Sequence, residues 1–299
     1  MAEVETGNSN SPPAAVHELI KTKAKKARSI NYPMDKVNRK LWENLEEINV
    51  NFLVGRNKKQ DISIIVTVNF DKLEGISISK TLTMFDKRVY IAVAALFNAG
   101  NETITLTQIH YTMGNTNKPA KYQIERINEA VTKMMMAVIY VDNSQEIESK
   151  YKYKRFSYTG SLLPSEKISA IVNGQLTDAA IHIFREPPLM TFARERRQLT
   201  TFEAKLLQST LSKTEANLAI EDYLLERISS TKAAAEAGRE KRTVINEILL
   251  DTLYKETGII NRIQRARAIE KIKAYFNYYV ECGFITIYKM KPDRIIFNF

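Results

Sequence analysis

Two segments of the chain combine an apolar helical face with basic and polar side chains on the opposite side. Apolar residues recur at offsets 0, 3, 7, 10 and 11 from Ile124, and at the same offsets from Ile269. This spacing lines one face of an α-helix, because successive residues lie about 100° apart around the axis. The residues opposite these faces are Tyr122, Arg126 and Lys133 in the first segment and Gln264, Arg267, Lys271 and Tyr278 in the second.

Side chains of these types can read the edges of base pairs. Arg and Lys pair with guanine O6 and N7, and Gln pairs with adenine N6 and N7, all in the major groove. Arg262 and Arg265 stand in the opening turns of the second segment, where a recognition helix projects beyond its own core. A solvated basic face on an ordinary helix is the alternative. The occurrence of the whole pattern twice in a basic chain favours binding to double-stranded DNA.

The elements around each long helix follow one order. A short helix ends at Gly114 in the first region and at Gly258 in the second, the long helix follows, and strand-like sequence comes next. Helix, turn, helix and hairpin together make a winged helix, so we predict an α+β protein of tandem winged-helix (helix–turn–helix) domains. The C-terminal hairpin turns at Pro292-Asp293. Its basic residues, predicted to contact phosphates, are Lys289, Lys291 and Arg294.

We expect both long helices to engage one continuous DNA site. A rival interpretation makes the first domain an assembly module, because Glu125 and Glu129 flank Arg126 and dilute its positive field. The predicted divisions are a disordered basic tail over 1–31, a first winged-helix domain with additional strands over 32–195, and a second winged-helix domain over 196–299. The lysines of the tail favour a solvated arm, with a phosphate-contacting arm as the alternative.

Periodicity and turn residues predict the remaining elements. We expect helices over 82–98, from 105 to 113, and from 119 to 138, and a short one through Leu41 and Trp42. We expect strands over 61–70, 137–142, 150–163, 167–172 and 179–185. Further helices are expected over 202–211, 215–237, 243–256 and 261–281, with a hairpin from Gly283 to Phe299.

The charge balance agrees with a polyanionic partner. The 299 residues include 44 Lys and Arg against 34 Asp and Glu, a formal net charge of +10. The apolar runs are too short to span a bilayer, the N-terminus has no signal-like apolar stretch, and Cys282 is the sole cysteine. We therefore expect a cytoplasmic protein without membrane contact.

Signatures of catalysis are missing from the sequence. It contains no Gly-x-x-x-x-Gly-Lys phosphate loop, and its histidines, His17, His110 and His182, are scattered, unlike the clustered ligands of a metal-dependent nickase. We expect no enzyme activity, no metal and no cofactor. A nickase or primase is the rival from another class, and an adaptor that binds an acidic protein is a third. The aromatic and basic residues of 150–158 admit two interpretations, a base-stacking surface or an ordinary alternating strand.

Four stretches resemble a known family. They begin at Glu186-Pro-Pro-Leu-Met, Leu218-Ala-Ile-Glu-Asp-Tyr, Ile248-Leu-Leu-Asp-Thr-Leu and Tyr279-Val-Glu-Cys-Gly-Phe-Ile. Together they resemble the C-terminal half of replication initiators (Rep proteins) from plasmids and phages of Gram-positive bacteria. The architecture is similar over about 32–299, and the sequence similarity is confined to the C-terminal third. The resemblance implies binding to origin repeats, recruitment of host replication proteins, and self-repression as a homodimer. A winged-helix transcriptional repressor or plasmid partition adaptor is the alternative.

Overall fold

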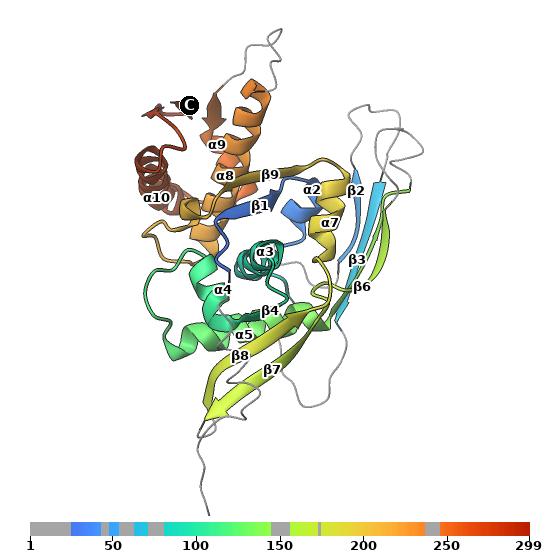
Figure 1. Cartoon of the computed structure of the whole chain (residues 1–299). Coiled ribbons are helices and arrows are strands. Elements are labelled where there is room, and N and C mark those ends of the chain that lie inside the picture. The colour runs from blue at the N-terminus through green and yellow to red at the C-terminus, as the bar shows by residue number, and fades with distance from the viewer. Residues whose placement is uncertain are drawn as a thin grey trace, which may run out of the picture.

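The computed structural model describes residues 25–42, 48–53, 63–70, 81–144, 156–172, 175–236 and 246–299, and it mixes helices with strands (Figure 1). The helices are α2 (Lys36–Lys40), α3 (Met84–Asn98), α4 (Leu106–Thr112), α5 (Lys121–Met136), α7 (Pro188–Glu195), α8 (Glu215–Glu236), α9 (Leu250–Glu256) and α10 (Arg262–Glu281), with a short 3-10 helix η1 (Ala204–Leu207). The strands are β1 (Ser29–Pro33), β2 (Ile48–Leu53), β3 (Ser63–Phe70), β4 (Thr103–Thr105), β5 (Ala137–Asp142), β6 (Ser157–Ser161), β7 (Ser165–Val172), β8 (Gln175–Ile183), β9 (Leu199–Glu203), β10 (Glu247–Leu249), β11 (Ile287–Met290) and β12 (Arg294–Asn298).

Two units of the fold share one order of elements. The first unit, within 84–183, runs α3, β4, α4, α5, β7, β8, and the second unit, within 215–298, runs α8, β10, α9, α10, β11, β12. Each sheet is antiparallel and places the last strand of the hairpin in the centre, in the orders β4-β8-β7 and β10-β12-β11. The repeat predicted from the sequence therefore has a counterpart in the topology.

Two strands of a second sheet, β5 and β6, lie between α5 and β7, and its other two strands, β2 and β3, precede the first unit. Strands β2, β3, β5 and β6 form an antiparallel sheet in that order, at one side of the molecule in Figure 1. Helix α5 leads directly into β5 at Ala137, so the prediction that a strand follows the long helix is confirmed. That strand does not belong to the hairpin of its unit, because β5 pairs with β3 and β6.

Side-chain caps fix where the first two helices of the first unit begin. Thr83 with Asp86, and Thr105 with Gln108, form capping boxes at α3 and α4. The turn after α4 needs its glycine, since Gly114 has φ of 97°, and a Cβ there would lie 1.9 Å from the carbonyl oxygen of Leu207. The turn of the first unit therefore packs directly on the backbone of η1.

The predicted limits of the N-terminal tail and of the domains need correction. Residues 29–31, assigned to a disordered tail, lie in β1, which pairs with β9 across the predicted boundary near 195. Ile30 and Tyr32 are buried there, which explains why this segment is ordered. Lys25 is held too: its backbone N–H donates to Asn101 Oδ1 at 2.8 Å, and its carbonyl accepts from Asn101 Nδ2 at 2.9 Å. Residues 1–24 lie outside the described residues.

Two predicted helices are replaced in part by strands. The segment 202–211 forms the end of β9 and then η1, because Phe202 pairs with Ile30 in a sheet. The segment 243–256 begins outside the described residues and continues as β10 before α9, since Ile248 pairs with Ile295 of the C-terminal hairpin. Partners distant in sequence decide between helix and strand for short apolar runs such as these.

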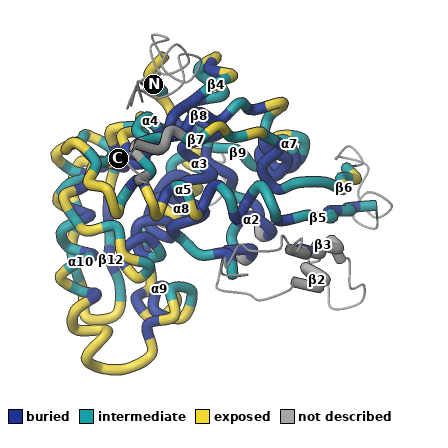
Figure 2. Tube along the Cα trace, turned by 90° about the horizontal axis from the view of Figure 1, so that it is seen from below, coloured by how far each residue is buried: buried dark blue, intermediate teal, exposed yellow. Residues whose placement is uncertain are grey.

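The two apolar cores meet at α3. Its residues Val89 and Val93 belong to the core of the first unit, whereas Ile91 and Ala95 pack with Ile30 and with α8, η1 and α10 of the second. Figure 2 shows buried segments continuing through α3, α5 and α8, while long exposed stretches lie along α10 and the end of the chain beyond it. Helix α8 is shared as well, since its Leu218 packs in the first core and its Leu224 in the second, so the described chain packs as two cores joined through α3 and α8.

Two aromatic residues, Phe156 and Tyr158, decide between the two interpretations of the 150–158 stretch for its described part. Phe156 is edge-on to Phe192 at a centroid distance of 5.3 Å, and the Tyr158 hydroxyl donates to the Ser161 carbonyl at 2.7 Å. Both side chains pack against the first core, as the ordinary strand interpretation expects. Residues 150–155 lie outside the described residues.

Candidate nucleic-acid interface

Helix α10 begins well before it reaches its own core. All seven residues from Asn261 to Arg267 are exposed, and the first buried residue is Ala268. At 3.6 residues per turn, about two turns of the helix are open to solvent on every side. The Asn261 side chain caps the helix by accepting from the Gln264 N–H at 2.9 Å, so this projecting end is held by local bonds.

Arginine supplies the charge at this end of α10. Arg262 and Arg267 are exposed and make no ion pair with any other described residue. Arg265 lies 3.4 Å from Asp251 Oδ1 and 5.0 Å over the Tyr254 ring. An exposed ion pair of this kind is worth at most about 1 kcal/mol, so a phosphate can displace Asp251. Three predicted site residues are therefore brought together here.

Gln264 has a different role from the predicted one. Its Oε1 accepts from the backbone N–H of Ile260 at 3.0 Å and of Asn261 at 3.2 Å. Recognition of adenine by a glutamine needs its amide oxygen as well as its nitrogen, and here the oxygen is engaged. Gln264 thus completes the capping box of α10.

The buried face of α10 differs from the predicted face. The helix buries Ala268, Ile272, Tyr275, Phe276 and Tyr279, whereas Ile269 and Val280 are only partly buried. The sequence pattern omitted Ala268 and Tyr275, and including them rotates the core face by roughly 50° at about 100° per residue.

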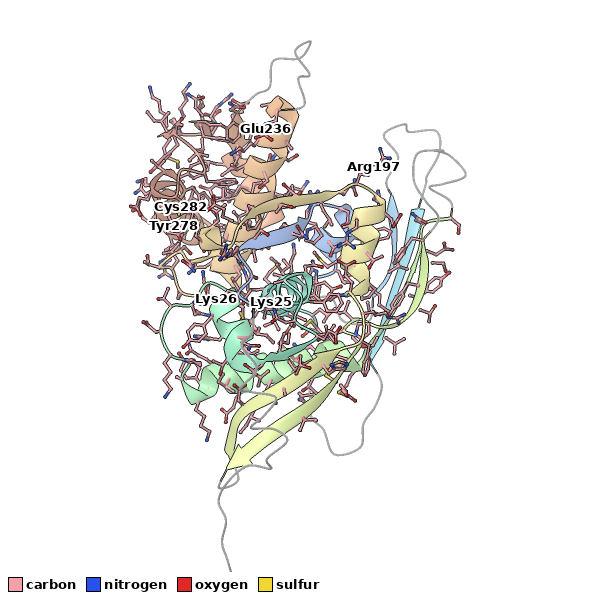
Figure 3. All side chains as sticks on the ribbon, in the orientation of Figure 1. Lys25, Lys26, Arg197, Glu236, Tyr278 and Cys282 are labelled. Atoms are coloured by element: carbon pink, nitrogen blue, oxygen red, sulfur yellow. The ribbon has the colours of Figure 1, made fainter. Side chains whose placement is uncertain are left out.

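This rotation changes the outer face of α10. Lys271 becomes partly buried, and the Tyr278 hydroxyl donates to the Lys205 carbonyl, so Tyr278 packs toward η1. Burial raises the pKa of Tyr278. Figure 3 shows Tyr278 and Cys282 together at the C-terminal end of α10. Lys271 and Tyr278 are therefore turned away from the outermost face of this helix.

The C-terminal hairpin presents two lysines and one compensated arginine. Lys289 and Lys291 are exposed and form no ion pair within the described chain. Arg294 donates to Asp293 Oδ2 at 2.6 Å and to Glu247 Oε2 at 3.0 Å, and these carboxylates raise its pKa. The two acidic partners therefore offset the charge of Arg294, whereas the charges of the two lysines stay uncompensated within the described chain.

The prediction that Lys133 of the first unit contacts DNA is wrong. Its side chain is buried, with Nζ 2.8 Å from Asp86 Oδ2 and 3.0 Å from the Thr81 carbonyl oxygen. Asp86 caps α3, and burial alone raises its pKa, so the ammonium group of Lys133 stabilises this carboxylate in place. In this arrangement Lys133 cannot contact DNA. A helix wheel alone does not show that a second helix covers this face.

Arg126 is partly engaged within the protein. Its guanidinium lies 3.7 Å from the Phe85 ring centroid and 3.2 Å from Glu215 Oε1 at the start of α8. Beside it a hollow of about 520 Å³ lies between α5 and the segment 208–214. Tyr122, by contrast, is 67% exposed. Of the three predicted residues on α5, Tyr122 alone faces solvent without an internal partner in the described chain.

Helices α5 and α10 are best aligned by the residues that cap their N-terminal ends, and less well by their buried residues. Ala120 precedes α5 and Asn261 precedes α10, and the third residue of each helix is a glutamine that accepts from the cap backbone. In this alignment Tyr122 matches Ile263, and both are 67% exposed. Helix α5 has 16 residues and α10 has 20, so α10 is one turn longer. The longer helix, α10, is therefore the one whose first turns extend beyond the buried core.

A buried charge cluster joins the two units, and sequence reasoning missed it. Lys87 Nζ lies 2.8 Å from Asp222 Oδ2, and Arg88 is ion-paired with Glu221, between α3 and α8. Burial lowers the pKa of Lys87 to about 8 and raises that of Asp222 well above its usual value. The helical spacing of these residues gave no signal, because their partners lie more than 130 positions away.

Within the described residues, no group of three or more His, Cys, Asp or Glu side chains could hold a metal ion. None of the described helices combines the length and apolar character needed to cross a membrane.

Comparisons with known proteins found structural likeness alone. No protein-family model matches the chain, and no curated protein sequence matches it. Among solved structures, the chain is similar to domains 2 and 3 of RctB, with a TM-score of 0.49 and 9% identity over 87% of this chain and 94% of that one. A selenomethionine form of the same two domains matches with a TM-score of 0.46 and 10% identity, over 80% of this chain and 83% of that one.

Proposed function

We propose that this chain is a non-catalytic replication initiator that binds specific sequences in double-stranded DNA through two winged-helix domains. The observation that carries the proposal is the N-terminal end of α10. Its first six residues are all exposed and include three arginines. It is also the second helix of a helix–turn–helix unit that closes with a hairpin.

This geometry suits the major groove, which is about 12 Å wide and admits one α-helix. Recognition helices contact base edges with the residues of their N-terminal turns, and a winged helix lays its hairpin against the backbone. In the second unit the base-contacting residues would be Arg262 and Arg267, and Arg265, which lies over the Tyr254 ring, would contact a phosphate. Further phosphate contacts would come from Lys289 and Lys291 on the hairpin.

The two units contribute unequally in this proposal. On α5, Lys133 is buried and Arg126 is paired with Glu215, while Glu125 and Glu129 are exposed. The second unit therefore supplies most of the binding energy, and Tyr122 remains as the contact from the first. An assembly role for the first unit, including a homodimer, is the alternative for this half of the chain.

Initiation is favoured among the DNA-binding roles by the resemblance of residues 186–285 to plasmid and phage replication initiators. An initiator would bind repeated origin sites and recruit host replication proteins. A repressor or partition adaptor with the same domains would bind DNA through the same residues, so the fold does not separate these roles.

Two linked experiments test the proposal. The full-length chain is first used to select duplexes from a random pool, and enrichment of one sequence motif is expected. A DNA fragment carrying that motif in tandem copies is then tested for autonomous replication in a host that expresses the chain. Replication that depends on the chain supports an initiator. Repression of a linked promoter without replication would support the alternative, and no enrichment would contradict DNA recognition altogether.

A further inference from the structure

The projecting end of α10 exposes two isoleucines as well as its arginines. Ile260 is 82% exposed and Ile263 is 67% exposed, the two highest values among the large exposed hydrophobic side chains except for Tyr122, which equals Ile263. Scattered apolar residues on a surface are ordinary. Ile260 precedes the cap residue Asn261 and so lies just outside the helix, whereas Ile263 and Ala266 lie three residues apart on α10 and make a small apolar strip on its first turns.

Ile263 stands at the outermost azimuth of the helix. At about 100° per residue, it lies within about 20° of the direction opposite the buried residues, and Ala266 and Arg267 flank that direction by about 50° each. Both Ile263 and Ala266 would face the floor of a groove that α10 enters. Arg262 and Arg267, which border the strip, have no acidic partner among the described residues.

We propose that Ile263 and Ala266 contact the 5-methyl groups of thymines in the major groove and so help to set the DNA sequence that the chain prefers. The methyl group of thymine is the apolar feature of the major-groove edge, and small apolar side chains are the groups that recognise it. A guanine–cytosine pair would place polar edges against the strip and leave them without hydrogen bonds. This proposal rests on the proposed function and adds the base type that the site selects.

Charge complementarity favours DNA over an apolar protein surface as the occupant. Cations border the strip on both sides, which suits phosphates on either side of a groove. Two acidic residues lie on the same face: Glu270 accepts from Lys273 at 3.0 Å, one turn beyond Ala266, and Glu281 is the last residue of the helix, at the far end from the strip. An apolar protein partner would bury Arg262 and Arg267 without counter-charges, which is costly.

Deoxyuridine tests the proposal because it lacks the methyl group of thymine and keeps the same hydrogen-bonding groups. The probe is the duplex that the full-length chain selects from a random pool, with each thymine replaced by deoxyuridine in turn. We expect about a fourfold loss of affinity at each contacted thymine, which corresponds to about 0.8 kcal/mol for one buried apolar carbon. Ile263→Ala should weaken binding to the thymine duplex and abolish the loss at one position.

Ile287→Ala is the matched control, since Ile287 is a 61% exposed isoleucine on β11 of the same unit. This variant should keep the full methyl dependence. Wild-type binding that ignores every deoxyuridine substitution would overturn this inference and leave the proposed function standing. An equal methyl dependence in wild type and Ile263→Ala would also overturn it. If the chain selects no sequence at all, the inference fails together with the proposed function.

Discussion

Lys87 Nζ lies 2.8 Å from Asp222 Oδ2 at the contact between α3 and α8, and both residues are buried. The pair belongs to a cluster that includes Arg39 and Glu226, 2.9 Å apart, and the ion pair of Arg88 with Glu221. Charged groups are buried in proteins at a large desolvation cost, which only close partners offset. The contact between the two units therefore depends on matched charges as well as on apolar packing.

Breaking this pair on one side should destabilise the protein strongly. Asp222→Leu leaves the Lys87 ammonium buried without its nearest counter-charge, so we expect a loss of about 3–5 kcal/mol in the free energy of unfolding. The double variant Lys87→Met with Asp222→Leu should recover most of that loss. Urea denaturation measures both. If the losses of the single variants Asp222→Leu and Lys87→Met simply add in the double variant, the two side chains are not coupled in the folded state.

The same lysine gives a prediction for pH dependence. The pKa of Lys87 is about 8 in the folded protein against 10.5 for a free lysine, so the unfolded chain binds more protons between these values. The cost of burying the ammonium is full below pH 8 and falls as the pH rises to 10.5. The stability of the wild type should therefore rise relative to that of Lys87→Met over this window, by up to about 3 kcal/mol. A difference that stays constant from pH 8 to 10 would contradict this expectation.

Arg267 should contribute to the discrimination between sequences. If it contacts a base, Arg267→Ala should cost about 1–3 kcal/mol on the selected duplex and less on random DNA. Fluorescence anisotropy with both duplexes measures the difference. Equal losses on both duplexes would make Arg267 a phosphate contact. Unchanged binding on both would remove this residue from the interface.

The hairpin should contact the backbone through its two lysines. Neutralising Lys289 and Lys291 should weaken binding to all sequences and flatten the slope of log affinity against log salt by about two units, roughly 0.9 per lost phosphate contact. Adding Arg294→Gln should change the slope little further, because Asp293 and Glu247 already offset that charge. A drop of about three units in the triple variant would show that Arg294 exchanges its partners for phosphate.

Lys133 should matter for stability and not for DNA binding. Lys133→Met removes the cation 2.8 Å from Asp86 and leaves that carboxylate buried, so a loss of about 3 kcal/mol in unfolding free energy is expected. Tyr122→Ala is the matched comparison on the same helix, since it should reduce DNA affinity with little effect on stability. Normal stability together with weaker DNA binding in Lys133→Met would restore the residue to the interface.

The sequence predicted the long helices and the order of elements well, since these depend on local periodicity and on caps such as Thr105 and Asn261. The prediction failed where a distant partner decides. Phe202 forms a strand because β1 lies beside it, and Lys133 is buried because Asp86 needs a counter-charge. The outer face of α10 was misplaced because the apolar pattern omitted Tyr275, which packs inward and donates to the Asn217 carbonyl at 2.9 Å. Ile263 was missed for the same reason.

The proposed function places the first turns of α10 in the major groove, and site-directed DNA cleavage measures that placement. The chain has one cysteine, so Cys282→Ser provides a background in which Arg262→Cys can carry a tethered iron chelate. With the selected duplex bound, we predict cleavage of both strands confined to a few base pairs of the selected motif. The same chelate attached through Ile168→Cys on β7 serves as the comparison and should give a different pattern or none. Full binding without local cleavage from position 262 would place the first turns of α10 outside the major groove.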